Sequence, residues 1–260
     1  MLAAFSVAVL VFLCFPIPIV VAMSFSSARS LEFPPPGLSL QWYVMLRDSP
    51  VWLNALGLSA GLAVTSATLA LILGSLAAYG LVRGNFPGKG LVESNLMAPL
   101  IVPPVIIALS LYIVLARSGL LGTLTGLLAG HTLLSLPYVV LFLSVAIRAF
   151  DIRIEHVAET LGASRRVVLT HVLLPNLWPN ALIAWLFAFL VSFDEVVLAL
   201  FIGGRHVTVP KRIFTELTLQ ISPVITAVAT VLIVMNAVVL VLLAVLARKR
   251  GAVAAAGLTP

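Results

Sequence analysis

The sequence predicts an all-α, polytopic membrane protein with six transmembrane helices, forming a single domain over residues 1–260. Hydrophobic residues make up 62% of the chain and charged residues 9%, whereas a soluble domain has about 45–50% and about 25%. Six stretches are long enough to span a bilayer, which takes about 20 apolar residues for about 30 Å of hydrocarbon. The intervals between them are too short for a separate soluble domain.

The first of these stretches is expected to be a retained membrane anchor. It is longer than the apolar core of a signal peptide and lacks both a basic leader and a clear cleavage site. The missing basic leader suggests that a few residues precede Met1. The expected spans are Leu2–Ser24, Asn54–Val82, Ser94–Ala116, Leu127–Ile147, Ala181–Ile202 and Pro223–Ala247.

Basic residues predict that both termini are cytoplasmic, because Lys and Arg are enriched in cytoplasmic loops. The predicted inner set is Arg83, Lys89, Arg148, Arg153, Arg165, Arg166, Arg248, Lys249 and Arg250. The predicted outer set is the smaller one, Arg29, Arg47, Arg117, Arg205, Lys211 and Arg212. The net charge of +6 is explained by these membrane-flanking loops, so no nucleic-acid partner is expected.

The first outer loop, residues 25–53, contains FPPPG followed by SLQWYVMLRDSPVW. The prolines favour a rigid turn, and the segment after them favours a short amphipathic helix lying at the membrane surface. Trp42, Tyr43 and Trp52 fit an interfacial aromatic belt. We expect this loop to be a surface helix without a ligand of its own.

The interval Arg148–Asn180 is polar but patterned like folded structure. Asp151 can cap a first helix, and Gly162 ends it in the left-handed conformation that glycine tolerates best. Ser164 can cap a second helix, which is expected to stop before Pro175. The apolar positions at helical spacing are Ile154, Val157, Ala158 and Leu161, then Val167, Val168 and Val172. A connector between spans needs only a few residues, so about thirty patterned ones predict a docking surface.

The stretch EHVAETLGASRRVVLTHVLLP resembles the cytoplasmic coupling loop of ATP-binding-cassette importer permeases. That pattern is Glu-Ala-Ala, three residues, Gly, nine residues, then Ile-x-Leu-Pro. Ala158 takes the second Ala position, His156 falls on the leading acid, and Glu155 lies one residue earlier, so the residue that replaces the acid stays open. The remaining matches are Gly162, Val172, Leu174 and Pro175.

The resemblance extends over nearly the whole chain. SFDEVVLALFIGG followed by TVPKRIF resembles the fifth span and the next outer loop of the second spermidine/putrescine permease subunit, which has the type I importer fold. The second predicted span carries small residues that would let helices approach closely. They are Gly57, Ala60, Gly61, Ser66, Gly74 and Ala78. Relatives for iron, thiamine or phosphonate share much of this sequence, so another solute remains an alternative to polyamines.

The resemblance implies a heteromeric complex in a bacterial inner membrane. The expected partners are membrane lipid, a second permease, an ATPase dimer and a periplasmic substrate-binding protein that meets the first and third outer loops. ATP and Mg would be bound by the ATPase, and this chain would hold no cofactor and catalyse no reaction. The implied ATPase-coupling residues are a small-residue face with a charged rim: Glu155, His156, Ala158, Glu159, Gly162, Ala163, Arg165 and Arg166.

Two adjacent carboxylates, Asp194 and Glu195, lie inside an apolar run that the sequence places on the fifth span. A carboxylate costs roughly 2.5–3.5 kcal/mol at mid-membrane on insertion scales, a cost that a wet cavity or a cationic partner relieves. Neighbouring aromatic residues would add cation–π contact with an ammonium group. The expected substrate path is Trp185, Ser192, Phe193, Asp194 and Glu195. The alternative is that the acids form a structural ion pair or hydrogen bond with the second permease subunit.

Other chemistries fit the sequence less well. GNFPGKG at Gly84–Gly90 fails as a phosphate loop, because its glycines are too close and no Ser or Thr follows the lysine. Cys14 is alone, and the four histidines are dispersed without metal-ligand spacing. An ion-coupled secondary transporter is the main rival, but no inverted repeat is evident. The histidines are His131, His156, His171 and His206.

Overall fold

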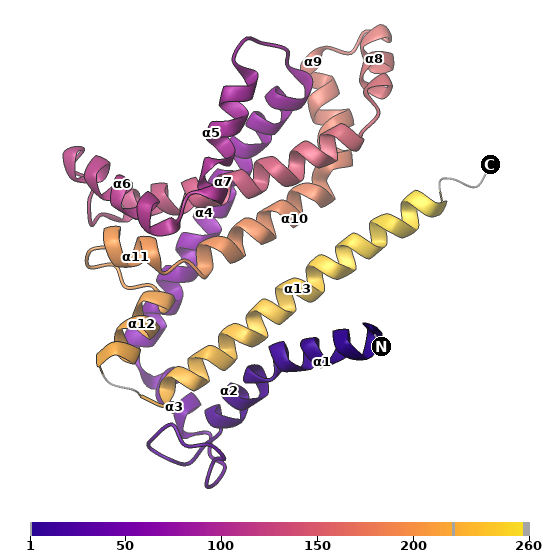
Figure 1. Ribbon diagram of the computed structural model, residues 1–260. Helices are drawn as coiled ribbons and strands as arrows, with labels where there is room; N and C mark the ends of the chain where they lie inside the picture. The colour runs from indigo at the N-terminus through magenta and orange to yellow at the C-terminus, as the bar shows by residue number, and fades with distance from the viewer. Residues whose placement is uncertain (1, 220–221, 257–260) are drawn as a thin grey trace. The chain divides into compact units, whose positions relative to one another are not determined.

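Every regular element of the computed structural model is a helix within the described part of the chain, residues 2–219 and 222–256 (Figure 1). The prediction of an all-α protein is therefore confirmed. The helices are α1 Leu2–Cys14, α2 Pro16–Ser24, α3 Gln41–Asp48, α4 Pro50–Arg83, α5 Lys89–Ile101, α6 Pro104–Arg117, α7 Leu124–Ala149, α8 Ile152–Thr160, α9 Arg165–Val167, the π-helix η1 Val168–Leu173, α10 Leu174–Phe193, α11 Val197–Ile202, α12 Val209–Leu219 and α13 Val224–Ala256.

Five helical segments in the described chain are long and apolar enough to cross a membrane, and a bent pair of helices raises the number to six. This confirms a polytopic membrane protein. The orientation of the termini stays a prediction, and the side chains of Arg248, Lys249 and Arg250, on which it partly depends, lie outside the described residues. The five segments are Phe5–Ser24, Pro50–Arg83, Leu124–Ala149, Arg165–Phe193 and Val224–Val245.

The third predicted span, Ser94–Ala116, is not one straight helix but falls on the bent pair α5 and α6, which is long and apolar enough to cross a membrane when the two are taken together. Helices α5 and α6 meet at an angle of 112°. Between them Val102 is extended, with ψ of 130°, as the residue before a proline prefers to be. Pro103 and Pro104 also remove two backbone N–H donors from any helix drawn through them. The two successive prolines therefore bend the third span sharply.

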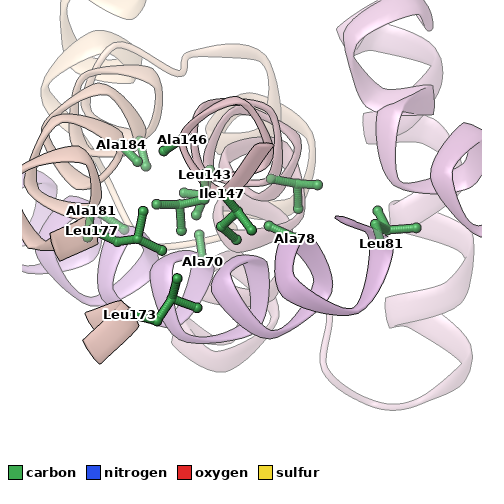
Figure 2. Close-up of a cluster of buried hydrophobic side chains, with 14 residues drawn as sticks. Ala70, Ala78, Leu81, Leu143, Ala146, Ile147, Leu173, Leu177, Ala181 and Ala184 are labelled. Atoms are coloured by element: carbon green, nitrogen blue, oxygen red, sulfur yellow. The ribbon is translucent and has the colours of Figure 1, made fainter. Parts of the chain in front are cut away.

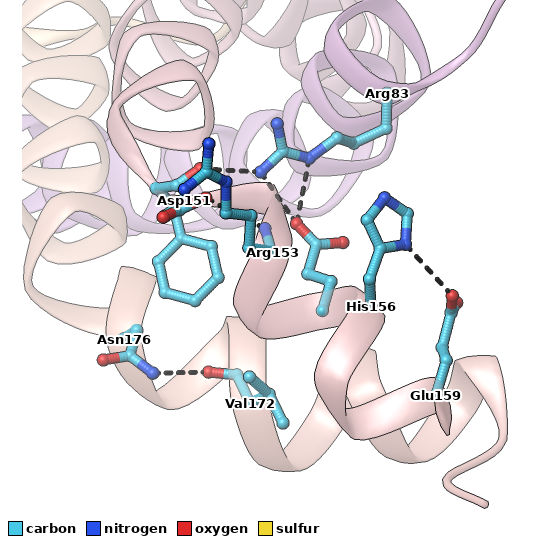
Figure 3. Close-up of polar contacts among 9 residues, drawn as sticks. Arg83, Asp151, Arg153, His156, Glu159, Val172 and Asn176 are labelled. Atoms are coloured by element: carbon cyan, nitrogen blue, oxygen red, sulfur yellow. Dashed lines mark hydrogen bonds and ion pairs between the residues drawn. The ribbon is translucent and has the colours of Figure 1, made fainter. Parts of the chain in front are cut away.

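The fifth predicted span, Ala181–Ile202, has the wrong bounds. The helical run begins at Arg165 and continues through α9, η1 and α10 to Phe193, and it does not stop before Pro175 as predicted. The π-helical turns of η1 lie directly before Pro175, where a proline ring would otherwise clash with the preceding turn. Asn176 Nδ2 donates to the carbonyl of Val172 at 2.7 Å, which satisfies that carbonyl beside the proline (Figure 3).

The chain forms two compact units, one of Met1–Leu58 with Thr208–Leu242 and the other of Ser59–Val207 with Leu243–Pro260. In the first unit, α3 confirms the short helix expected after the prolines. Trp42 and Trp52 are buried, and Trp42 Nε1 donates to the carbonyl of Ser26 at 2.8 Å. The prediction that these tryptophans form an interfacial belt is wrong, because both pack inside the unit.

In the second unit, α7 packs between α10 and α5, and small residues line the helix contacts (Figure 2). Gly74 shows how close α4 and α7 come, since a Cβ there would lie 2.6 Å from Val139 Cγ1. By contrast, a Cβ at Gly57 or Gly61 would meet nothing within 4 Å in the described part of the chain, so neither glycine marks a close helix contact there. Buried alanines of this core are Ala67, Ala70, Ala78, Ala146, Ala181, Ala184 and Ala188.

The loop between α4 and α5 is a tight turn, as the sequence predicts. Gly88 has a φ of +80°, which favours glycine, and the ammonium of Lys89 donates to the carbonyl of Gly84 at 3.0 Å. The lysine is thus engaged with the backbone of its own turn.

Candidate functional site

The segment between α7 and α10 forms the expected helix, glycine turn and second helix. Asp151 caps α8, with its Oδ1 accepting from the N–H of Arg153 at 2.9 Å. At the other end, the N–H of Gly162 donates to the carbonyl of Glu159 and the N–H of Ala163 donates to that of Ala158, both at 3.0 Å. This pair of bonds, with a φ of +90° at Gly162, is a Schellman motif. The predictions for Asp151 and Gly162 are confirmed.

Ser164 stands at the N-cap position of α9, but its hydroxyl makes no capping hydrogen bond. Its backbone is extended, with ψ of 156°, and its carbonyl accepts from the N–H of Val168 at 3.0 Å. The position of the second helix start is therefore predicted correctly, while the side-chain cap is not formed.

One side of α8 carries exposed apolar side chains. Ile154, Val157 and Leu161 are 48%, 58% and 83% exposed, and their spacing of three and four places them on one side of the helix end. Exposed apolar patches on such a segment mark interaction surfaces. The small residues Ala158 and Ala163 are only half-buried within the Schellman turn. The most exposed apolar side chains of this segment are therefore branched ones, and a docking role for the small residues stays a prediction.

The predicted charged rim divides into two groups. Glu159, Arg165 and Arg166 are exposed, and His156 Nδ1 lies 3.4 Å from Glu159 Oε2 (Figure 3). Glu155, in contrast, is 6% exposed. Its predicted place on the docking rim is wrong, because the first turn of α8 directs its side chain into the protein.

Arg83, the last residue of α4, holds the buried Glu155 carboxylate. Its Nη2 lies 2.7 Å and its Nε 2.9 Å from Glu155 Oε1, and Nη2 also donates to the carbonyl of Phe150 at 2.9 Å (Figure 3). Phe150 is the residue between α7 and the cap of α8. One guanidinium thus joins α4 to α8 and to the backbone that leads into it.

The two intramembrane acids lie at the break between α10 and α11, outside both helices. The prediction that they project from a continuous fifth helix is therefore wrong. Asp194 is the C-cap residue of α10 and is exposed. Glu195 is half-buried, and its Oε1 accepts from the N–H of Leu198 at 2.9 Å, so it caps the start of α11. The two acids therefore differ in their surroundings: Asp194 is exposed, and Glu195 is half-buried with its carboxylate hydrogen-bonded to a backbone N–H.

A buried polar cluster fixes the end of α10. His131 on α7 is 1% exposed, and its Nδ1 lies 2.9 Å from Ser192 Oγ and 3.1 Å from the Ser192 carbonyl. Ser66 on α4 donates to Ser192 Oγ at 2.8 Å. Since buried polar groups require such partners, the cluster ties three helices together directly before Asp194. Ser192 is thus buried and hydrogen-bonded to α4 and α7, next to the residues predicted for the substrate path.

Aromatic side chains form a row along α10 toward the same break. The rings of Trp185 and Phe189 are 5.8 Å apart and those of Phe189 and Phe193 are 5.6 Å apart. Trp185 is half-buried, and its Nε1 donates to Thr68 Oγ1 at 3.0 Å, whereas Phe193 is buried. Of the five residues predicted for the path, Asp194 is exposed, Trp185 and Glu195 are half-buried, and Ser192 and Phe193 are buried. Their contact with a solute stays a prediction.

Comparison with known proteins identifies the family. Residues 70–251 match the binding-protein-dependent transport system inner membrane components. The chain belongs to this family. As an inner membrane component of a transport system, it is a multi-pass permease and not an enzyme.

Relatives of this permease include two from Escherichia coli K12. The spermidine/putrescine transport system permease protein PotC is 32% identical over 95% of this chain and 93% of its own length. The putrescine transport system permease protein PotI is 36% identical over 85% of this chain and 82% of its own. A solved bacterial ABC transporter involved in alginate import has the same fold, with a TM-score of 0.72, 14% identity and coverage of 92% of both chains.

The permease's buried polar anchors were not identified from its sequence. Arg83 appeared only as one of several inner basic residues, and His131 only as one of four scattered histidines. A usable signal existed in each case, because a lone ionisable or polar side chain within or at the end of an apolar helix needs a specific partner. The identity of that partner depends on the packing of α4, α7 and α10.

Proposed function

We propose that this permease forms half of the translocation pathway of an ATP-driven importer whose solute is a polyamine. A second permease forms the other half, an ATPase dimer binds ATP and Mg, and a periplasmic binding protein delivers the solute. Both termini of the chain face the cytoplasm. The permease itself holds no cofactor.

The exposed apolar face of α8 is the observation that carries this proposal. It lies outside the segments that can span a membrane, yet Ile154, Val157 and Leu161 face outward on it. A partner that covers this face removes apolar surface from water at about 25 cal/mol per Å². The exposed charges of Glu159 and Arg165 at the edge would fix the register of docking.

The polyamine assignment draws support from the relatives' names and from Asp194. PotC and PotI are named as permeases for spermidine/putrescine and for putrescine. An exposed carboxylate at a helix break can pair with an ammonium group, and Trp185 can offer its ring face to the same cation. Glu195 is the lesser candidate, since its side chain is half-buried whereas Asp194 is exposed.

The test uses proteoliposomes that contain both permeases and the ATPase dimer, with ATP inside and the loaded binding protein outside. Asp194→Asn keeps the shape and removes the charge, so the KM for putrescine or spermidine should rise by about 10- to 100-fold, the worth of a charged hydrogen bond. The rate of ATP hydrolysis should change little, because the proposed contact with the ATPase is made by α8 and not by Asp194. Glu195→Gln is the matched control, as its amide oxygen can still accept from Leu198 N–H.

Two results would overturn the polyamine assignment and leave the permease assignment intact. One is polyamine uptake at the parental rate by both Asp194→Asn and Glu195→Gln. The other is a wild-type complex that transports an anion or another solute, such as iron or thiamine. A structural acid would instead lower the assembled yield and depress uptake and ATP hydrolysis together.

A further inference from the structure

The Arg83 side chain is more deeply buried than those of Arg47, Arg148 and Arg212, which also form ion pairs. Its side chain is 11% exposed and that of Glu155 is 8% exposed. The Arg148–Glu93 pair connects α7 with α5 in the same unit, but its atoms are 3.5 Å apart and its side chains are 62% and 45% exposed. Exposed pairs of this kind contribute little, whereas a buried pair depends strongly on its geometry.

The contacts of Arg83 enclose the joint between α7 and α8. Phe150, whose carbonyl accepts from Nη2, ends α7, and Glu155 lies in the first turn of α8. The Asp151 cap lies between these two contacts. Because the planar guanidinium donates in fixed directions, it holds the carbonyl and the carboxylate at a fixed separation. The base of α8 is thereby fastened to the end of α4.

The other end of α8 is continuous with α10. The Schellman turn at Gly162 leads into α9, and the helical run through η1 ends at Phe193, directly before Asp194. Helix α8 is therefore joined covalently to α7 at its start and, through the turn and η1, to α10 at its end, while Arg83 gives it a polar connection to α4. Only the polar one can be removed by a single side-chain substitution.

We propose that Arg83 is a positioning residue for coupling: through Glu155 and the Phe150 carbonyl it makes α4 move with α8 when the ATPase displaces α8. The inference rests on the proposed function, since it requires that α8 receive the ATPase. Coupling of this type is a rigid-body transfer between two states, and a loosened joint would dissipate the displacement before it reaches α4. Glu155 thus acts inside the joint, and the docking surface lies on the opposite side of α8.

The experiment measures solute uptake per ATP hydrolysed in proteoliposomes with the complete complex, at equal assembled amounts. Arg83→Lys keeps the charge, but its one nitrogen cannot occupy the positions of both Nε and Nη2, from which the guanidinium contacts Glu155 and Phe150. We therefore expect the ratio to fall at least threefold. Arg83→Ala should lower it at least tenfold while ATP hydrolysis continues. The matched controls are Arg148→Lys and Arg148→Ala, at the exposed pair, which should stay within twofold of wild type.

The outcomes separate this inference from the proposed function. If the wild-type complex shows no ATP-dependent uptake, the proposed function is wrong. If the wild type transports but the Arg83 variants lose uptake and ATP hydrolysis in parallel, with the ratio within twofold of wild type, only the role of Arg83 is refuted. Failure of both Arg83→Ala and Arg83→Lys to assemble would likewise show that the residue serves folding and would overturn the proposal.

Discussion

Gly162→Ala is the substitution that most cleanly disturbs the turn between α8 and α9. A Cβ at Gly162 would meet nothing within 4 Å, so the added methyl group causes no clash. The backbone, however, has a φ of +90°, where an L-residue is disfavoured by roughly 1–2 kcal/mol. The whole effect is therefore backbone strain, which acts against the two hydrogen bonds of the Schellman motif.

The strain sets the size of the expected effect. If the ATPase binds only the formed turn, 1–2 kcal/mol lowers its affinity for the permease pair by roughly 5- to 30-fold. Gly162→Asn should lie between wild type and alanine, because asparagine tolerates the left-handed region better. Gly162→Asp should reduce affinity further, since it adds a charge beside the apolar face of Val157 and Leu161.

The assay titrates purified ATPase subunits against the two permeases in lipid nanodiscs and measures the Kd. Gly90→Ala, on exposed α5 backbone with open space for a Cβ, is the matched control and should leave the Kd unchanged. A Kd for Gly162→Ala within twofold of wild type would refute the argument that the left-handed turn is needed for docking. An equal loss in Gly90→Ala would show that the effect is not specific to the turn.

Two further predictions concern packing and the buried polar cluster. Gly74→Ala should lower the free energy of unfolding by about 1–3 kcal/mol, because its Cβ would lie 2.6 Å from Val139 Cγ1. In thermal unfolding, adding Val139→Ala should restore part of the lost stability, and the control Gly61→Ala should lose none. If the losses of Gly74→Ala and Val139→Ala simply add, the two residues are not in contact. His131→Phe removes both contacts of His131 Nδ1 with Ser192, and Ser192→Ala removes the hydroxyl that His131 and Ser66 both contact. Each variant should lower thermal stability by about 1–3 kcal/mol and reduce uptake, and unchanged stability in both variants would refute the anchoring role.

The sequence predicted those features that depend on local pattern. Apolar length gave the membrane spans, and the polar interval after Arg148 gave a capped helix with a glycine end. Asp151 and Gly162 were predictable because caps and left-handed turns are determined by a few neighbouring residues. The family resemblance was carried by that same local spacing and is confirmed.

The misplaced features depend on packing or on competing local signals. The Val-Pro-Pro sequence at residue 102 breaks the third span, although the apolar count there favours a single helix. Asp194 and Glu195 end α10 because Glu195 can cap α11, which hydrophobicity alone does not show. The buried position of Glu155 depends on Arg83, which is 72 residues away in the sequence. Such a pairing cannot be derived from periodicity.

The central claim is that this permease imports solute only as part of an ATP-driven complex. The most direct measurement compares polyamine uptake into proteoliposomes that contain the full complex, with ATP inside and the loaded binding protein outside, and into proteoliposomes that contain this chain alone under a proton or sodium gradient. We predict ATP-dependent uptake by the complex and none by the chain alone. Uptake by the chain alone, driven by the ion gradient, would contradict the account and favour a secondary transporter.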